Sequence, residues 1–336
     1  MEKKKIAMII DVRGWAFDNI ALRVKENLPE YDIDVIPGDL FEGNMVKLFL
    51  FCQDYDLIHF LWRGFLTLID REEMKNYAET LGISLEDFIN QYVLNKNITF
   101  TVCDQLFVNT EDEWKNYEAM KYAKAYFVTS KILFKLYDKY EKKPSMIIHD
   151  GVDLKKYKPE NLDRFNNLTH VRVGWAGNSK FKDSENDSDL KGVEGIIKPA
   201  ISELQQEGYD IELILADRNI KKIPQEEMPK FYNNIDLYIC ASKTEGTPLT
   251  VLEAMAMGIP VISTDVGIVK EALGPYASKY IMEERSKDEL KRKLKEIIQN
   301  KKDFEIISKE NLEQIKEWDW EKISKKYKEF FELNMN

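Results

Sequence analysis

The chain has 336 residues, of which 44% are hydrophobic and 32% are charged, and its formal net charge is −10. Binding a phosphate backbone requires clustered lysine and arginine, so this acidic balance argues against nucleic acid as a partner. A chain of this length is long for a single hydrophobic core, so we expect two domains.

The cysteines indicate a reducing compartment. Cys52, Cys103 and Cys240 are far apart and each lies in an apolar run, as buried, reduced thiols do. No apolar stretch approaches the ~18 residues of a membrane span, and the first apolar run ends at Asp11, too early for the core of a signal peptide. We therefore expect a cytoplasmic protein, and peripheral contact with the inner face of a membrane stays open.

Short apolar runs alternate with longer amphipathic stretches along the chain. In the first half the strand-like runs are 6–11, 33–37, 57–62, 98–104, 125–130 and 146–151. In the second half they are 171–177, 211–217, 236–242, 260–264 and 279–283. Continuous apolar strands separated by helical patterns predict parallel sheets that are covered on both faces.

Two segments interrupt this alternation. The polar stretch 156–170 lacks periodicity and is typical of a linker between two such sheets. Residues 65–96 form an additional helical segment with six acids against three bases. We interpret it either as a solvated pair of helices or as a lid on one side of a binding site.

The polar residues that follow each strand are the candidate binding residues, because ligands of doubly wound sheets bind beyond the carboxyl ends of the strands. After the run 236–242, Thr247 is a predicted N-cap, Pro248 suits the first helical position, and Gly258 ends the helix. The free backbone N–H groups at such a helix start, which is reached through Gly246, predict an anion site that extends to Leu249.

Two carboxylates flank this helix start. Glu245 lies in the preceding loop, and Glu253 lies about a turn and a half inside an otherwise uncharged helix. They could hold two parts of one ligand whose anionic middle rests on the helix start, which is the shape of a nucleotide sugar. The alternative is that Glu245 is an ordinary loop carboxylate and that Glu253 is buried with a backbone partner.

A second anion-binding pattern follows the run 171–177. It offers Asn178, Lys180 and Lys191, and the two lysines could neutralise a diphosphate. Alternatively, both lysines are exposed surface residues. The acidic stretch 183–189 lacks the spacing of a calcium loop, so we interpret it as a mobile surface loop and predict no metal ion.

Three stretches resemble a known family. "EGTPLTVLEAMAMGIPVIST" (245–264) resembles the signature of retaining glycosyltransferases with the GT-B fold, family four (glycosyl transferases group 1), in which seven residues separate two glutamates. "IIHDGVDLKKYKP" (147–159) is similar to the family's domain-junction motif, and "GWAGNSKF…KG" to its phosphate-binding segment. The resemblance covers nearly all of 145–336 and is weaker over 1–144.

The resemblance implies an α/β fold of two Rossmann-like, doubly wound domains that face a cleft. Residues 1–160 with 318–336 would form the acceptor-binding domain, because the closing helix of the family crosses back to it. Residues 161–317 would form the domain that binds the nucleotide sugar.

The resemblance also implies roles for individual residues. Glu245 would contact the donor sugar at the reacting face, and Glu253 would bind the ribose hydroxyls. Backbone groups of Gly246, Thr247, Pro248 and Leu249 would hold the diphosphate. Lys180 and Lys191 would balance its charge, and Asn178 matches the family less clearly.

The first half departs from the family. In place of the usual Gly-Gly loop it has "DVRGWAFDN", where Trp15, Phe17 and Asn19 could contact an acceptor or belong to the core. Where the family often has a histidine, this chain has Asp104, which we assign a catalytic role. Two further acceptor-side candidates are His59, within the run 57–62, and Arg63, directly after it. The alternative for His59 is a structural role.

The resemblance implies that the sequence is that of a glycosyltransferase. It would move a sugar from a nucleotide diphosphate sugar to a glycan or lipid-linked glycan in polysaccharide biosynthesis, with retained configuration and without a metal ion or other cofactor. A non-catalytic donor-binding subunit, or an epimerase or phosphorylase on the same fold, remains the alternative. The basic, amphipathic segment 131–144 could lie on a membrane surface or pack its apolar side inward.

Overall fold

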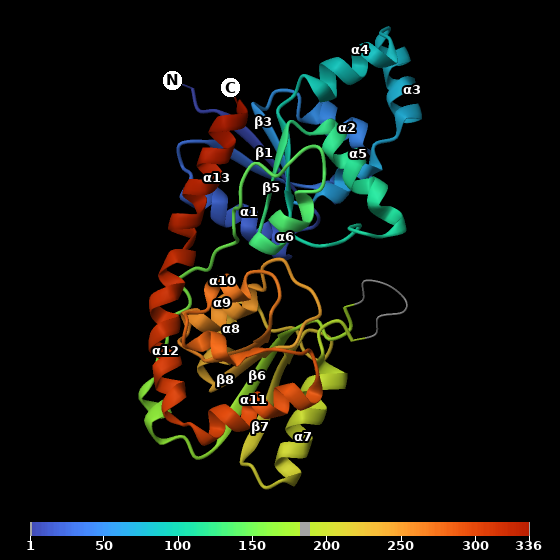
Figure 1. Ribbon diagram of the computed structural model, residues 1–336. Helices are drawn as coiled ribbons and strands as arrows, with labels where there is room; N and C mark the ends of the chain where they lie inside the picture. The colour runs from blue at the N-terminus through green and yellow to red at the C-terminus, as the bar shows by residue number, and fades with distance from the viewer. Residues whose placement is uncertain (1, 182–188, 336) are drawn as a thin grey trace. The chain divides into compact units, whose positions relative to one another are not determined.

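The structure, a computed structural model, describes residues 2–181 and 189–335. The chain divides into two compact units, residues 1–150 with 320–336 and residues 151–319 (Figure 1). The chain therefore enters the second unit after residue 150, whereas the predicted boundary is residue 160. It returns to the first unit after residue 319, whereas the predicted boundary is residue 317.

The described part of the first unit contains one five-stranded parallel sheet in the order β2-β1-β3-β4-β5. Its strands are β1 (Lys5–Ile10), β2 (Asp32–Pro37), β3 (Leu57–Phe60), β4 (Ile98–Val102) and β5 (Ala125–Val128). Its helices are α1 (Ala16–Asn27), α2 (Met45–Phe51), α3 (Arg71–Leu81), α4 (Leu85–Ile89), α5 (Trp114–Tyr122), α6 (Lys131–Tyr137) and α13 (Trp320–Met335).

Alternating side chains of β1 divide the core of this unit into two layers, because successive strand residues point to opposite faces. Ile6, Met8 and Ile10 pack with residues of α1 and α13. Ala7 and Ile9 pack with residues of α2, α5 and α6 on the other face. The sheet is thus covered by helices on both faces, as the continuous apolar runs predict (Figure 1).

The last helix, α13, belongs to the first unit although it follows the second unit in the chain, and this prediction is confirmed. It packs against α1 and buries an apolar stripe at helical spacing. The stripe consists of Trp320, Ile323, Tyr327, Phe330 and Phe331.

Three segments of the first unit refine the sequence analysis. The sequence predicts a sixth strand at residues 146–151, and this prediction is wrong, since Ile147 makes only an isolated bridge to Val128. Residues 65–96 contain α3 and α4, and their buried Phe88 shows that this pair is not merely solvated. Leu133 and Tyr137 of α6 are also buried, so its apolar side packs inward. Among the described residues, no helix is long and apolar enough to cross a membrane.

The second unit, in its described residues, contains a five-stranded parallel sheet in the order β10-β9-β8-β6-β7. Its strands are β6 (Val171–Gly177), β7 (Ile211–Asp217), β8 (Leu237–Cys240), β9 (Val261–Thr264) and β10 (Ile281–Met282). Its helices are α7 (Lys198–Gln206), α8 (Met228–Asn233), α9 (Leu249–Ala256), α10 (Val269–Ala272), α11 (Lys287–Gln299) and α12 (Lys302–Gln314).

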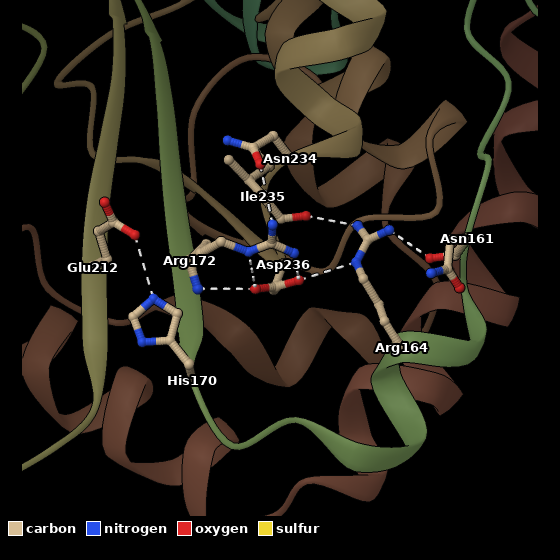
Figure 2. A network of polar contacts seen from close by, with 8 residues as sticks. All are labelled: Asn161, Arg164, His170, Arg172, Glu212, Asn234, Ile235 and Asp236. Atoms are coloured by element: carbon tan, nitrogen blue, oxygen red, sulfur yellow. Dashed lines mark hydrogen bonds and ion pairs between the residues drawn. The ribbon is translucent and has the colours of Figure 1, made fainter.

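The predicted linker 156–170 is anchored to this sheet. Asp236, which directly precedes β8, is fully buried, and its carboxylate accepts hydrogen bonds from Arg164 Nε at 3.0 Å and Arg172 Nη2 at 2.9 Å (Figure 2). Arg164 Nη2 also donates to the carbonyl of Ile235 at 2.7 Å. A buried carboxylate needs such partners, so Arg164 ties this stretch to the sheet and the stretch is not a free linker.

Candidate functional site

The carboxyl ends of β6 and β8 in the second unit carry most of the predicted donor-side residues. The loop after β8 is tied to the chain that follows β6, because the Lys243 N–H donates to the carbonyl of Leu190 at 2.9 Å. Arg285 strengthens the connection by donating from Nε to the carbonyl of Ala241 at 2.9 Å and from Nη2 to that of Asp189 at 2.6 Å. Two segments far apart in the sequence therefore form one edge.

Glycine is required where these segments approach each other. Gly192 has φ +73°, and a Cβ atom there would lie 2.6 Å from the carbonyl oxygen of Ala241. Gly267, with φ +54°, passes so close to the loop before α9 that a Cβ atom would lie 2.0 Å from the carbonyl oxygen of Gly246. Any larger residue would displace the backbone at either position. The position of the loop 241–247 is therefore fixed from two sides.

Helix α9 begins one residue later than predicted. Pro248 is its N-cap, and no side chain caps the helix start. The hydroxyl of Thr247, predicted as the cap, is buried and has no hydrogen-bond partner among the described residues. The predicted end is correct, because Gly258 has φ +67° and its N–H donates to the carbonyl of Met255 at 2.9 Å.

The loop carboxylate and one predicted lysine meet at this edge. Lys191 Nζ lies 2.5 Å from Glu245 Oε1, and the hydroxyl of Ser242 donates to the same oxygen at 2.7 Å. The side chains of Lys191 and Glu245 are 22% and 19% exposed, so water can still reach the pair. Lys191 Nζ also lies 5.5 Å from the centroid of the half-exposed Phe181 ring.

The second glutamate of the motif is buried and has three side-chain partners. Glu253 Oε1 accepts hydrogen bonds from the hydroxyl of Tyr157 at 2.6 Å and from Gln225 Nε2 at 3.0 Å. Its Oε2 accepts one from the hydroxyl of Tyr232 at 2.7 Å. Burial raises the pKa of the Glu253 carboxyl, and the three hydrogen bonds act in the opposite direction. These partners are side chains, not the backbone group that the alternative interpretation predicts.

The other donor-side candidates, Asn178 and Lys180, follow the end of β6. Asn178 Oδ1 accepts hydrogen bonds from Asn219 Nδ2 at 2.7 Å and from the backbone N–H of Lys180 at 3.1 Å. The Lys180 side chain is exposed, and within the described residues no hydrogen bond of its ammonium is found. The acidic stretch 183–189 lies outside the described residues except for Asp189, which accepts a hydrogen bond from the Gly195 N–H at 2.7 Å.

In the first unit, Arg63 and Asp104 form an ion pair in a different setting. Arg63 Nη2 lies 2.7 Å from Asp104 Oδ1, and the arginine side chain is fully buried. Its Nε donates to Asn116 Oδ1 at 2.7 Å, and Nη2 also donates to the carbonyl of Leu106. The guanidinium lies over the ring of Phe107, whose φ of +69° is strained for a bulky residue. Arg63 thus holds the loop that follows β4.

The predicted cleft residue His59 is part of the core. Its ring nitrogens lie 2.9 Å from the hydroxyl of Thr99 and 3.0 Å from that of Thr101. The ring stacks on Phe127 at a centroid distance of 5.4 Å, and Tyr327 of α13 packs at its edge. Complete burial lowers the pKa of His59 to about 3, so the imidazole is neutral at physiological pH.

The three residues of the first loop differ in exposure. Trp15, at the N-cap of α1, is 50% exposed, and Asn19 is exposed one turn later. Phe17 is partly buried and packs against the core. The loop is closed by Asp18, which accepts hydrogen bonds from the Gly14 N–H and from Arg13 Nη1, both at 2.8 Å. The side chains of Trp15 and Asn19 are therefore accessible to solvent, whereas that of Phe17 is not fully so.

Sequence reasoning missed the partners of Glu253. Tyr157 lies in the junction motif, and Tyr232 lies in the "MPKFYNN" stretch before β8, where each reads as an ordinary core aromatic. Gln225 lies in a polar turn and carries no recognisable signal. A single carboxylate in a helix with no other charged residue indicates that hydrogen-bond donors for it must lie elsewhere in the protein, but it does not identify those donors.

Comparisons with known proteins agree with the resemblance. Residues 218–314 match the sequence profile of the family "Glycosyl transferases group 1". A mannosyltransferase of lipopolysaccharide core biosynthesis, LpsB of Rhizobium meliloti, is 44% identical over 57 residues, which are 17% of this chain and 16% of LpsB. TuaC of Bacillus subtilis, described as a putative teichuronic acid biosynthesis glycosyltransferase, is 33% identical over 78 residues, or 23% of this chain and 18% of TuaC. The chain thus matches less than a fifth of the length of either relative.

Solved structures resemble the whole chain. The HepE protein of Anabaena, crystallised with UDP-glucose, covers 98% of this chain and 99% of its own, at 14% identity and a TM-score of 0.68. A sucrose-phosphate synthase of Thermosynechococcus elongatus also covers 98% and 99%, at 16% identity and a TM-score of 0.65. At such identities the likeness concerns the fold. Two parallel, helix-covered sheets and a last helix packed on the first unit give the GT-B class that the sequence predicts.

Proposed function

We propose that this chain, a member of the glycosyl transferases group 1 family by its residues 218–314 and its GT-B fold, is an enzyme that transfers a sugar. The donor would be a nucleotide diphosphate sugar, and the product would retain the anomeric configuration of the donor. The acceptor would be a glycan or a lipid-linked glycan, because the matched segments of LpsB and TuaC come from proteins named for such assembly.

The ion pair of Lys191 and Glu245 supports this proposal best. Glu245 lies in the chain that leads into α9, whose start has no side-chain cap, and Lys191 reaches it from the segment that follows β6. An ammonium has three donors, and Lys191 uses one of them on Glu245. A diphosphate could accept the others while it rests on the N–H groups of the helix start. The buried, unpartnered hydroxyl of Thr247 offers one more donor at the same place.

The donor would then divide between the two glutamates. Glu245 would face the sugar, where positive charge develops at the anomeric carbon as the bond to phosphate breaks. Glu253 would bind the ribose. Lys180 and Lys191 would stabilise the departing diphosphate, whose oxygen would take the proton of the acceptor hydroxyl on the same face of the sugar. Charge that is stabilised mainly in the transition state raises the rate of transfer.

The acceptor side is assigned from exposure. Trp15 and Asn19 have exposed side chains with which to bind an acceptor. Asp104, which is 26% exposed, would be the polar group of the first unit that faces the transferred sugar. His59 and Arg63 are fully buried, so we assign them structural roles instead of acceptor contacts.

The test is transfer by the purified chain alone. Wild-type protein is incubated with UDP-, GDP- and ADP-sugars, and release of the nucleoside diphosphate and the anomeric configuration of the product are recorded. We expect turnover, and Glu245→Gln should lower it about a hundredfold or more. Glu305→Gln, which alters an exposed pair with Lys309 in the same unit, should be neutral. Binding of donor without turnover would instead indicate a donor-binding subunit, whereas interconversion of free nucleotide sugars would indicate an epimerase.

Metal independence is tested in the same assay. Lysines and helix N–H groups can meet the charge of the diphosphate, so we expect full turnover in excess chelator. An absolute requirement for magnesium or manganese would contradict this mechanism, and it would direct attention to the acidic stretch 183–189.

A further inference from the structure

The three partners of Glu253 differ in how firmly the fold holds them. Tyr157 and Tyr232 are 4% and 0% exposed and belong to the hydrophobic core, with ring centroids 5.9 Å apart. Gln225 is exposed and lies in the short 3₁₀ turn Gln225–Glu227 before α8. The two tyrosines therefore cannot leave without opening the core, whereas Gln225 can be withdrawn by a movement of a surface turn.

Gln225 covers one oxygen of the carboxylate. Its Nε2 lies 3.0 Å from Glu253 Oε1 and 2.9 Å from the hydroxyl oxygen of Tyr157, which itself donates to Oε1 at 2.6 Å. The turn that carries Gln225 is polar and makes few apolar contacts, since Gln225, Glu226 and Glu227 are all exposed. The amide is thus the surface-side member of an otherwise core-bound cluster.

We propose that Gln225 is a displaceable cap on Glu253, which the ribose hydroxyls of the donor replace; this inference rests on the proposed function. A ribose hydroxyl and a carboxamide N–H are both neutral donors. The buried carboxylate therefore keeps the same number of hydrogen bonds when one replaces the other. Such an exchange avoids the cost of leaving a buried charge without a partner. The cap keeps the buried carboxylate hydrogen-bonded when no nucleotide is present.

A cap that competes with the ligand weakens binding, so its removal should strengthen binding. Gln225→Ala leaves only mobile water to compete for Glu253 Oε1. We expect the dissociation constant for a nucleoside diphosphate to fall on the order of threefold to tenfold. Gln225→Glu also removes the cap, because a carboxylate cannot donate to Glu253, but its negative charge repels the diphosphate, so we expect no gain in nucleotide affinity from this variant.

The experiment is calorimetric titration of UDP, GDP and ADP and of their 2′,3′-dideoxy analogues. The proteins are wild type, Gln225→Ala, Gln225→Ser, Gln225→Glu and the control Gln299→Ala. Gln299 is a matched control because its Nε2 also donates to a tyrosine hydroxyl, that of Tyr209 at 3.2 Å, on the surface of the same unit. Thermal melting confirms that each variant is folded.

We expect tighter binding of the ribose-containing nucleotide by Gln225→Ala and Gln225→Ser, no gain for the dideoxy analogue, and no change in Gln299→Ala. Unchanged or weaker nucleotide binding in Gln225→Ala would overturn the cap, and so would an equal gain for the dideoxy analogue. If wild-type protein binds none of the nucleoside diphosphates, the proposed function itself fails. That result differs from one in which nucleotide binds and only the Gln225 variants behave otherwise than expected.

Discussion

Two of the ion pairs that follow the carboxyl ends of strands, Arg63–Asp104 in the first unit and Lys191–Glu245 in the second, differ in how many partners the basic group has within the protein. Arg63 is fully buried, and it bonds Asp104, Asn116 and the carbonyl of Leu106. Lys191 bonds Glu245 and lies over one half-exposed ring, and both members of that pair are partly exposed. Among the described residues Arg63 Nη1 has no partner either, but it is buried, whereas the Lys191 ammonium is partly exposed. Similar placement in a doubly wound sheet is thus compatible with a clamp on a strained loop in one unit and, as we propose, with a ligand contact in the other.

The most severe test of this difference removes the buried arginine. Arg63→Ala should destabilise the protein by about 3–5 kcal/mol. The substitution removes the counter-charge of Asp104 and the buried donors that bond Asn116 and the carbonyl of Leu106. Arg63→Lys should recover part of this, since it restores charge but not the fork of donors. Chemical denaturation measures the effect. Arg13→Ala, whose side chain is 53% exposed in its pair with Asp18, is the control. If Arg63→Ala unfolds like the control, the clamp does not exist.

A smaller effect is expected at Glu253, where the change should appear in binding. Glu253→Gln should raise the dissociation constant of a nucleoside diphosphate about tenfold to a hundredfold, because charge-assisted hydrogen bonds contribute roughly 1.5–3 kcal/mol. The bound donor should still react at a similar rate, since ribose contacts change little as the bond breaks. Calorimetry and single-turnover kinetics separate the two quantities. Normal nucleotide affinity in this variant would make the cluster purely structural.

A third test of the comparison removes Lys191, the basic member of the partly exposed pair. Lys191→Met should leave the free energy of unfolding within about 1 kcal/mol of wild type, as for other partly exposed pairs. It should raise the dissociation constant for a nucleoside diphosphate roughly tenfold, because one charge-assisted contact to phosphate is lost. Lys198→Met is the matched control, since Lys198 also lies 2.5 Å from a glutamate in the same unit. Equal behaviour of the two variants would refute a role for Lys191 in anion binding.

The smallest effect concerns an exposed pair that serves as a reference. Hydrogen bonds to Asp210, and secondarily to Glu212, raise the pKa of His170 above its ordinary value. The protonated form is therefore favoured in the folded state. The interaction of protonated His170 with these carboxylates contributes fully to stability below pH ~6.5. This contribution disappears as the pH rises through the higher pKa that His170 has in the folded state. Denaturation midpoints of wild type and His170→Asn, measured between pH 5 and pH 8, should converge at the upper end. A constant difference across that range would contradict this assignment.

The fold was predictable because its information is local. Continuous apolar strands, and a helix ended by Gly258, follow from neighbouring residues, and the alternation of strands with helices fixes the class. The start of α9 was misplaced by one residue because Thr247 and Pro248 are both acceptable at the boundary. The aromatic stripe in the sequence of α13 identified a packed helix, but only the family resemblance identified the unit that receives it.

The site was less predictable because its contacts are long-range. Tyr157 is 96 residues from Glu253 in the sequence, and Asp104 is paired to an arginine whose burial no local pattern indicates. The same holds for Asp236, one of whose two arginine partners, Arg164, lies in a stretch that is typical of a linker. Polar residues at strand ends can be identified from sequence, but which of them have partners inside the protein depends on tertiary packing.

The place of α13 in the first unit has a consequence for biosynthesis. A ribosome releases residues 1–150 first, yet the aromatic stripe that covers Phe127 and His59 emerges only after residues 151–319 have been made. The second unit, whose elements are contiguous in sequence, can therefore complete its core before the first unit does. Throughout that interval α1 covers only part of this sheet face, and the rest is an exposed apolar surface of the kind that molecular chaperones bind.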